Sequence, residues 1–252
     1  MPSKKQSRKI GLARALSKLG YCSRSQAAEL IRAGRVRLNG SVRRDPETPT
    51  HLEQDCITVD GQTIEAKKKV YLVMNKPRGV VTTASDDKGR ETVYGVLQRD
   101  GESLPWVAPV GRLDKASEGL LLLTNDSEWG ARIAAPETHL EKTYHVQIGM
   151  VANTDLVQLL VNGVKSDGEL LRARAATVLR SGEKNSWLEI MLDEGKNRQI
   201  RRMLETLGVE VLRLVRVAIG PLALGELAKG TFRALTKEEK QALDRALRAR
   251  IS

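Results

Sequence analysis

Hydrophobic residues near the start of the chain recur every three or four positions, which is the spacing that helices show. Four such residues between Ile10 and Leu19 predict one helix, which Gly20 would end. A second helix is predicted after Ser23, whose hydroxyl can cap it, and Gly34 would end this helix. The chain is therefore expected to open with two short helices.

Short strands are predicted after these helices. Residues 36–38 alternate apolar and charged side chains before Asn39-Gly40, a pair that favours a hairpin turn. Residues 57–64 have the pattern of a second hairpin around Asp60-Gly61. We expect the first part of the chain to form a helix–helix–hairpin unit.

The rest of the chain alternates strand-like and helix-like segments. Apolar or alternating runs predict strands at 70–74, 120–123, 142–148, 187–192 and 211–219. Helical spacing predicts helices at 154–163, with Thr154 as the cap, at 200–207, and in the tail from 236 to 250. This order favours an α+β fold, in which a small α/β unit precedes a larger domain built on a mixed or antiparallel sheet.

A charged connection, Ala66-Lys67-Lys68-Lys69, separates the two parts and marks the natural boundary. We predict a basic tail at 1–9, an N-terminal domain at 10–66, a larger domain at 70–236 and a helical tail at 237–252. The larger part is long enough to bury a core of its own.

The distribution of charge adds a partner to this picture. The net charge of +11 arises wholly from the first 44 residues, which hold twelve lysines and arginines against one acid, Glu29. The remaining residues hold thirty charges of each sign. A polyanion is the expected partner, with nucleic acid favoured over a membrane surface.

Composition excludes several classes of protein. The chain has no apolar run as long as a membrane span and no secretory signal, so we expect no membrane partner and a cytoplasmic location. Cys22 and Cys56 are predicted to be reduced thiols, and a disulfide between them is the alternative. The three histidines lie in no metal-ligand spacing, so no metal site is expected.

One short segment carries the strongest chemical signal. Arg112 and Asp114 lie just before residues 118–124, whose four consecutive leucines predict a buried strand. A carboxylate close to an apolar interior is costly unless it is paired or functional. The alternative is a loop aspartate that caps a turn.

Four segments together resemble, in order and spacing, the pseudouridine synthases of the RsuA/RluB/RluF type: Met74–Gly79, Gly111–Thr124, Glu141–Val146 and Glu194–Met203. The N-terminal unit resembles the S4 RNA-binding domain, chiefly through Ser23-Arg24, Gly34-Arg35-Val36 and Asn39-Gly40. The resemblance implies an isomerase that needs no cofactor and that modifies ribosomal RNA, free or in a pre-ribosomal particle, with the large-subunit RNA favoured. A monomer is expected.

Pseudouridine formation breaks the bond between ribose C1′ and uracil N1, turns the base and rejoins it through C5. The resemblance gives catalytic roles to Asp114, Tyr144 and Arg201. Asp114 would be the reacting carboxylate, which attacks C1′ or C6 or removes a 2′ proton. Arg201 would lie beside it and keep it ionised. Tyr144 would stack on the target base, although a tyrosine on this strand can also be simple core.

Further residues are assigned to substrate binding. Arg112 would fill the gap left by the extruded base or clamp a phosphate, and Lys76 would shape one wall of the cleft. Arg198 and Arg202 are placed on the outward face of the helix at 200–207, where they would be solvated or contact phosphate. The N-terminal unit would add four arginines: Arg24, Arg32, Arg35 and Arg37.

Several alternatives stay open. The same chemistry could act on small-subunit ribosomal RNA or on tRNA, or the chain could be an RNA-binding ribosome-assembly protein without turnover. A DNA-binding protein is a third reading, because the basic segment suits either polymer. Two departures from the family pattern, at Lys115-Ala116-Ser117 and Lys196-Asn197-Arg198, bear on substrate choice more than on activity.

Overall fold

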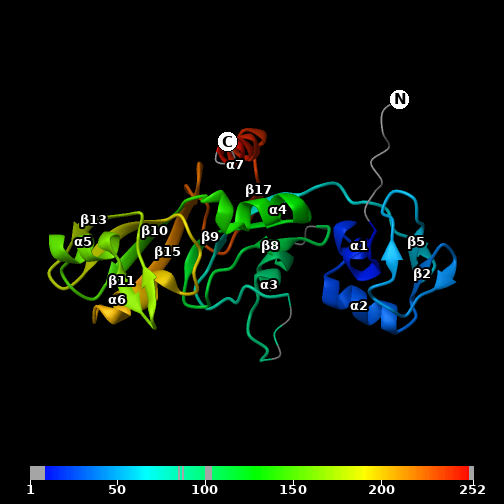
Figure 1. The fold of residues 1–252 in the computed structure, drawn as a ribbon, viewed down its shortest axis with the longest axis horizontal. Helices are drawn as coiled ribbons and strands as arrows, with labels where there is room; N and C mark the ends of the chain where they lie inside the picture. Colours follow the sequence, from blue (N-terminus) through cyan, green and yellow to red (C-terminus); the bar gives the residue numbers. More distant parts are fainter. Residues whose placement is uncertain (1–8, 85, 87, 100–103, 250–252) are drawn as a thin grey trace. The chain divides into compact units, whose positions relative to one another are not determined.

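The computed structural model describes residues 9–84, 86, 88–99 and 104–249. These residues form two compact units (Figure 1): one contains the described residues among 9–70, 104–108 and 124–127, and the other contains those among 71–99, 109–123 and 128–249. The predicted α+β fold is confirmed. Within the described ranges, no helix has the length and apolar character that crossing a membrane requires.

The N-terminal unit packs two helices on a small sheet. Helices α1 (Leu12–Lys18) and α2 (Arg24–Arg32) share a core with strands β2 (Val36–Leu38) and β5 (Ile57–Val59). The sheet has the order β3-β2-β5-β6, in which β3 is Ser41–Val42 and β6 is Gln62–Thr63. Ser23 caps α2, as predicted, in a capping box with Gln26.

One prediction in this unit is wrong. The first helix does not begin at Ile10, because Ile10–Gly11 forms strand β1 and pairs with β4 (Pro49–Thr50). The two predicted hairpins are confirmed, and their turn residues lie in the left-handed region: φ is 51° at Asn39 and 49° at Asp60, each followed by a glycine.

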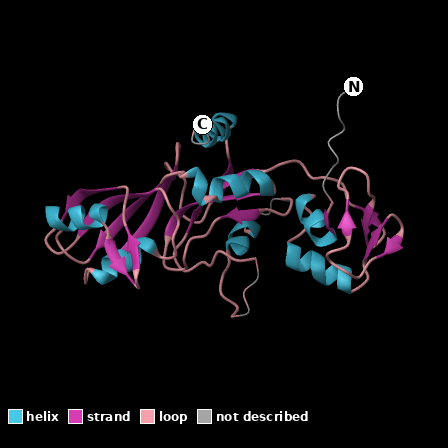
Figure 2. Ribbon diagram, in the orientation of Figure 1, coloured by secondary structure: helices cyan, strands magenta, loops and turns pink. Residues whose placement is uncertain are grey.

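A mixed nine-stranded sheet organises the second unit, and Figure 2 shows its long strands side by side. Its main order is β13 (Ala175–Ser181), β14 (Ser186–Leu192), β10 (Lys142–Ile148), β15 (Val211–Ile219), β9 (Glu118–Thr124), β7 (Tyr71–Lys76) and β17 (Phe232–Ala234). Two short strands extend it, β8 (Ala108–Val110) beside β9 and β16 (Leu222–Ala223) beside β15. Strand β15 pairs antiparallel with β10 and parallel with β9.

Two hydrophobic clusters cover this sheet. The first joins β10, β14 and β15 to α5 (Thr154–Asn162) and α6 (Gln199–Thr206). The second joins β7 and β9 to α4 (Ser127–Ala134) and α7 (Lys237–Arg248), which lie together in Figure 1 and are linked by a hydrogen bond from Trp129 to Asp244. The remaining elements are α3 (Val93–Gln98), the 3₁₀ turn Pro136–Thr138, β11 (Val164–Ser166) and β12 (Glu169–Leu171).

The cap of α5 differs from the prediction. Asn153, not Thr154, is the N-cap, and its side chain accepts a hydrogen bond from the Leu156 amide at 2.9 Å.

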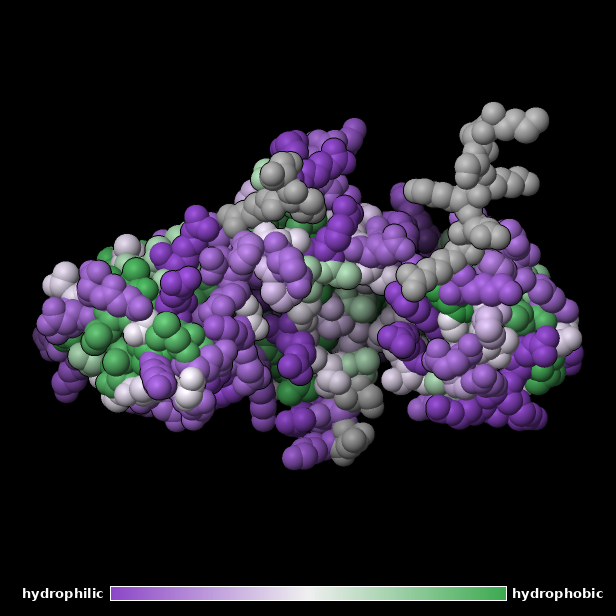
Figure 3. All heavy atoms as spheres, viewed as in Figure 1, coloured by the Kyte–Doolittle hydropathy of each residue, from purple (hydrophilic) through white to green (hydrophobic). Residues whose placement is uncertain are grey.

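Near α5 the surface is apolar, which Figure 3 shows as green spheres in the region where Figure 1 labels this helix. Leu159 and Leu170 contribute to it, with 46% and 57% of their surface exposed.

Gly119 fixes the parallel contact between β9 and β15, because the two backbones approach closely there. A Cβ atom at this position would lie 2.3 Å from the carbonyl oxygen of Arg216 and 2.9 Å from its amide nitrogen. The φ angle of Gly119 is also +100°, which side chains rarely adopt. Only glycine fits at this junction of the sheet.

We predict that Gly119→Ala lowers the free energy of unfolding by at least about 3 kcal/mol, since it combines backbone strain with a collision against backbone atoms that cannot move aside. Gly168→Ala is the matched control, because Gly168 also has a positive φ of +80° but has open space around it. Gly168→Ala should lower the free energy of unfolding by about 1–2 kcal/mol. Urea-induced unfolding compares the two, and equal losses would show that the close approach is unimportant.

Candidate active site

A pocket of about 330 Å³ opens where the two hydrophobic clusters of the second unit meet. Leu192, Ile200 and Leu214 of the first cluster line it, together with Val110, Ile133 and Ile219 of the second. The loop between β8 and β9, which contains Asp114, closes one wall. This pocket therefore combines apolar walls with a carboxylate, as binding sites for small polar groups do.

Lys76 anchors this loop from inside the protein. Its side chain is fully buried, and Nζ donates to the carbonyl oxygens of Pro77 at 3.1 Å, Asp114 at 3.2 Å and Ser117 at 2.8 Å. Three carbonyl oxygens match the three donors of an ammonium group. Burial nevertheless lowers the pKa of Lys76 to about 8, and the charge of Arg216 adds to the shift, against the opposing effects of Asp114 and Glu118. Lys76 is buried and does not line the pocket, so the geometry favours a structural role for Lys76 over direct contact with substrate.

Further hydrogen bonds from side chains and backbone amides fix the rest of this loop. Thr82 Oγ1 donates to the Leu113 carbonyl at 2.8 Å, and the amide of Gly79 donates to the carbonyl of Lys115 at 2.8 Å. The loop also closes on itself, since the Ser117 amide donates to the Asp114 carbonyl at 3.0 Å. The backbone around Asp114 is therefore fixed at several points, while its side chain points away from these anchors.

The Asp114 carboxylate is more exposed than the sequence suggests, with 42% of its side chain accessible. Its nearest cation is Arg198, whose Nη1 lies 3.8 Å from Oδ2. The sequence placed Arg198 on the outward face of a helix, but Arg198 is the N-cap of α6 and has a left-handed backbone with φ of 48°. This conformation takes it out of the helix, which is why it can face Asp114.

Arg201 does not make the expected ion pair with Asp114. Its Nη2 instead donates to the carbonyl oxygen of Ala116 at 3.0 Å, so Arg201 is a further anchor of the loop. Burial lowers the pKa of Arg201 below its usual value, and the nearby Arg198 adds to this, whereas the Asp114 carboxylate opposes it. Arg201 is thus close enough to act on Asp114 through its field, without direct contact.

Tyr144 lines the pocket from β10, where it is half-buried and packs against the first cluster. Opposite it on β15 is Arg216, at a β-bulge between Thr143 and Tyr144 in the pairing of these strands. Bulges re-aim side chains. Here the extra residue breaks the alternation of β15, so that Leu214, Arg216 and Ile219 all line the pocket.

The other two residues of this unit that were predicted to bind substrate, Arg112 and Arg202, differ in their surroundings. Arg112 is exposed and lines both the pocket and an adjoining hollow of about 430 Å³ that includes Asp114 and Asn197. Arg202 is neither solvated nor free for phosphate, because it contacts Asp167 at 3.5 Å and Glu169 at 3.0 Å and so joins α6 to the β11–β12 hairpin. These contacts make Arg202 structural.

The four arginines of the N-terminal unit are all exposed. Arg35 forms an ion pair with Asp60, and Arg37 donates to the Gly40 carbonyl at 3.1 Å. The side chains of Arg24 and Arg32 make no hydrogen bond or ion pair within the part of the chain that the structure describes. These two are the arginines most available to a phosphate.

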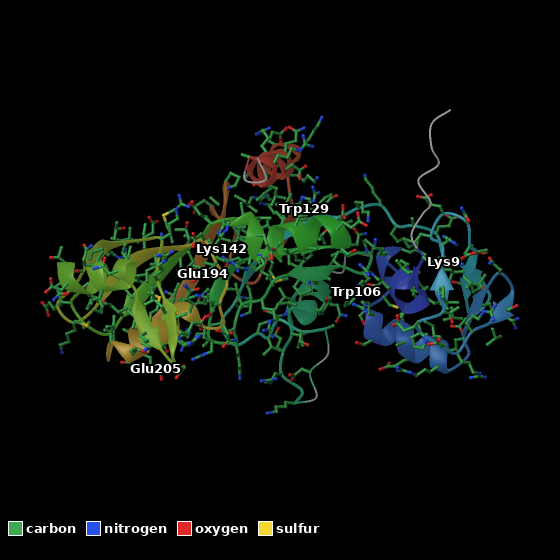
Figure 4. The ribbon with its side chains drawn as sticks, viewed as in Figure 1. Lys9, Trp106, Trp129, Lys142, Glu194 and Glu205 are labelled. Atoms are coloured by element: carbon green, nitrogen blue, oxygen red, sulfur yellow. The ribbon has the colours of Figure 1, made fainter. Side chains whose placement is uncertain are left out.

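Positive charge dominates the pocket. Of the seven charged side chains that line it, six are cations: Arg112, Lys142, Lys196, Arg198, Arg201 and Arg216. Lys142, Lys196 and Arg216 were not among the residues predicted to form the site. Lys142, at the start of β10, is labelled in Figure 4. A signal for Arg216 was available, because an arginine two residues after Leu214 in a largely apolar strand lies on the same face as that leucine.

Metal ligands are not assembled within the described ranges, where no group of three or more histidines, cysteines, aspartates or glutamates lies close enough to hold an ion. A cationic pocket with one carboxylate, in a chain whose first 44 residues carry the whole net charge, is typical of an enzyme that modifies a nucleic acid. Family models agree: residues 70–206 match the RNA pseudouridylate synthase family, and residues 10–55 match the S4 domain.

The chain belongs to the RNA pseudouridylate synthase family and is a pseudouridine synthase that acts on RNA. It is 35% identical to ribosomal large subunit pseudouridine synthase B of Bacillus subtilis, over 92% of this chain and 94% of that protein. It is 37% identical to an uncharacterised RNA pseudouridine synthase of Rickettsia typhi, over 90% and 92%. A crystal structure of a pseudouridylate synthase superposes with a TM-score of 0.63 at 29% identity, over 93% of this chain and 99% of that one.

The lowered pKa of Lys76 predicts a specific pH dependence of stability. The lysine loses its proton near pH 8 in the folded chain and near 10.5 in the unfolded chain. Between these values the unfolded state binds more protons, so the free energy of unfolding should rise with pH. Between pH 8 and 10.5, the free energy of unfolding of the wild type should rise by about 3 kcal/mol relative to that of Lys76→Met.

Urea-induced unfolding at pH values from 7 to 10 measures this difference. Lys115→Met is the matched control, because Lys115 lies in the same loop but is exposed. Its stability should follow that of the wild type at every pH. Parallel curves for wild type and Lys76→Met would show that Lys76 does not titrate in this window.

Proposed function

We propose that this chain converts a uridine of large-subunit ribosomal RNA to pseudouridine, with Asp114 as the reacting carboxylate. One observation carries the proposal: among the described residues that line the pocket, Asp114 is the single carboxylate and faces six cations. The choice of RNA is supported by the Bacillus subtilis relative, which is named for the large ribosomal subunit. Small-subunit RNA and tRNA are the alternative substrates.

In this proposal the target base leaves the RNA stack and enters the pocket. Tyr144 and the apolar walls formed by Leu192 and Leu214 contact the flat base, and Arg112 occupies the space that the base leaves. Asp114 then attacks C1′ or C6, or removes the 2′ proton, so that the C1′–N1 bond breaks. The isomerisation releases the C5 proton and adds a proton at N1, with no net change in oxidation state, so the residues named here need no redox partner.

The positions of Arg198 and Arg201 suggest a division of labour at Asp114. Arg201 fixes the loop through the Ala116 carbonyl, so it sets where the carboxylate lies. Arg198 contacts the carboxylate itself at 3.8 Å, a distance that leaves the oxygens accessible to a substrate. Together the two cations fix the position of Asp114 and lie beside it without covering it.

We predict that Asp114→Asn lowers the rate of pseudouridine formation by at least about 10³-fold, because the amide cannot act as nucleophile or base. Affinity for RNA should change little, since the side chain keeps its size. Tritium release from ribosomal RNA labelled at uridine C5 measures the rate. Asp167→Asn is the matched control, at a carboxylate that is 85% exposed and lies outside the pocket. A rate near wild type for Asp114→Asn would exclude Asp114 as the reacting group.

The choice of RNA is tested separately. Pseudouridines are mapped in ribosomal RNA and tRNA from cells that lack this chain and from cells that express it. The proposal requires a single class of lost sites in the large-subunit RNA. Loss of a site only in small-subunit RNA or in tRNA would move the assignment to that molecule without changing the chemistry.

The free arginines of the N-terminal unit give a further prediction. If Arg24 and Arg32 each neutralise one phosphate, the double variant Arg24→Gln/Arg32→Gln should reduce the slope of log affinity against log salt by about 1.4–1.8. Arg35→Gln is the control and should change the slope much less, because Asp60 already neutralises Arg35. Filter binding at several salt concentrations measures the slopes. Equal slopes for the double variant and the wild type would show that these arginines do not contact RNA.

A further inference from the structure

Arg216 is a buried cation without a matching anion. Its side chain, on β15, is only 5% exposed, and Nε donates to the Leu120 carbonyl at 2.7 Å. Nη2 is buried and has no hydrogen-bond partner. Among the residues that the structure describes, no carboxylate lies within ion-pair distance of Arg216.

The carboxylate of the neighbouring strand β9 and the carboxylate of the pocket are engaged elsewhere. Glu118 is paired with Arg213 and Lys229, and Asp114 lies beside Arg198. A second buried cation, Lys76, is close enough for Arg216 to lower its pKa. A buried charge without a partner costs several kcal/mol, so this arrangement is unfavourable unless a ligand completes it.

The position of Arg216 identifies the ligand. Its backbone lies between Tyr144 on β10 and Gly119 on β9, and its side chain lines the same pocket as Asp114. Phosphate groups of RNA stay outside a pocket that takes an extruded base, whereas the carbonyl oxygens of that base enter it. A guanidinium group offers several donors in one plane and suits such oxygens.

We propose that Arg216 binds the extruded uracil through a carbonyl oxygen and stabilises the negative charge that the base acquires during the reaction. The proposal rests on the function assigned above to the same pocket. When the C1′–N1 bond breaks, its electron pair stays on the base, and the resulting uracil anion spreads this charge over its two carbonyl oxygens. The charge disappears when C5 bonds to C1′. C5 then releases its proton to solvent and N1 takes up a proton, so the product is neutral pseudouridine.

The geometry of the turning base adds a second role. Rotation of uracil by half a turn about the axis through N3 and C6 exchanges N1 with C5, and it also exchanges the two carbonyl groups. A donor that binds one carbonyl oxygen before the turn therefore meets the other one after it. Arg216, held rigidly by the Leu120 carbonyl and the sheet, can serve the base in both orientations.

The free base 6-azauracil tests this without RNA, because it has the size of uracil and loses a proton near neutral pH. Its affinity is measured by calorimetry at pH 6 and pH 8 for the wild type, Arg216→Met and Arg216→Lys. The wild type should bind the anion at least about tenfold more tightly than the neutral base, which corresponds to 1.4 kcal/mol. Arg216→Met should lose this preference, and Arg216→Lys should keep part of it.

Arg180→Met is the matched control, because Arg180 is an exposed arginine of the sheet outside the pocket, and it should behave as the wild type. Thermal unfolding verifies that each variant folds. If Arg216→Met does not fold, Arg216→Lys decides, and it should bind the anion at least about threefold more weakly than the wild type. Unchanged preference in the folded variant, or no preference in the wild type, overturns the proposal.

A kinetic arm separates this proposal from the function on which it rests. Single-turnover rates on tritiated ribosomal RNA should fall at least about a hundredfold in Arg216→Met while RNA affinity stays unchanged. Asp114→Asn is assayed beside it and should retain the azauracil preference of the wild type. If Asp114→Asn stays active while Arg216→Met loses the anion preference, the role of Asp114 fails and that of Arg216 stands.

Discussion

The candidate active site depends on one buried ammonium group. Lys76 lies entirely inside the second unit and binds three carbonyl oxygens, two of which belong to the loop that presents Asp114. Its charge is costly to bury, which the lowered pKa of about 8 records, but its three donors hold a loop that has no regular secondary structure of its own. Burying this charge lowers the stability of the protein, but it fixes the position of a half-exposed carboxylate.

Several cationic side chains lie around that loop, and few carboxylates lie near them. Arg198 lies beside Asp114, Arg201 holds the Ala116 carbonyl, and Arg216 is buried without an anion. Such a pocket is incomplete when empty, since cations close together repel one another. In the proposed reaction, the extruded base acquires the negative charge that would balance these cations. The N-terminal unit carries a separate excess of positive charge, so the proposed binding along the RNA and the proposed recognition of one base involve different arginines.

The family match and the physical reading agree on the activity but differ on details of the site. The expected pair of Asp114 with Arg201 is replaced by a pair with Arg198, and the expected surface role of Arg202 is replaced by contacts with Asp167 and Glu169. The helix at 199–206 was correctly predicted, yet its first residue was not. The left-handed backbone of Arg198, just before this helix, places its side chain beside the loop.

The sequence by itself determined the α+β class, the two-part organisation, most elements and the segment that contains Asp114, because these follow from local spacing of apolar residues, glycines and caps. Only the tertiary structure decided which side chains meet. Lys76 is buried because β7 lies inside the sheet, Arg198 faces Asp114 because its backbone is left-handed, and Arg216 enters the pocket beside a bulge in β15. These outcomes depend on strand order, one dihedral angle and one extra residue in a strand pair. Such features arise from packing between segments far apart in the chain, which no local pattern records.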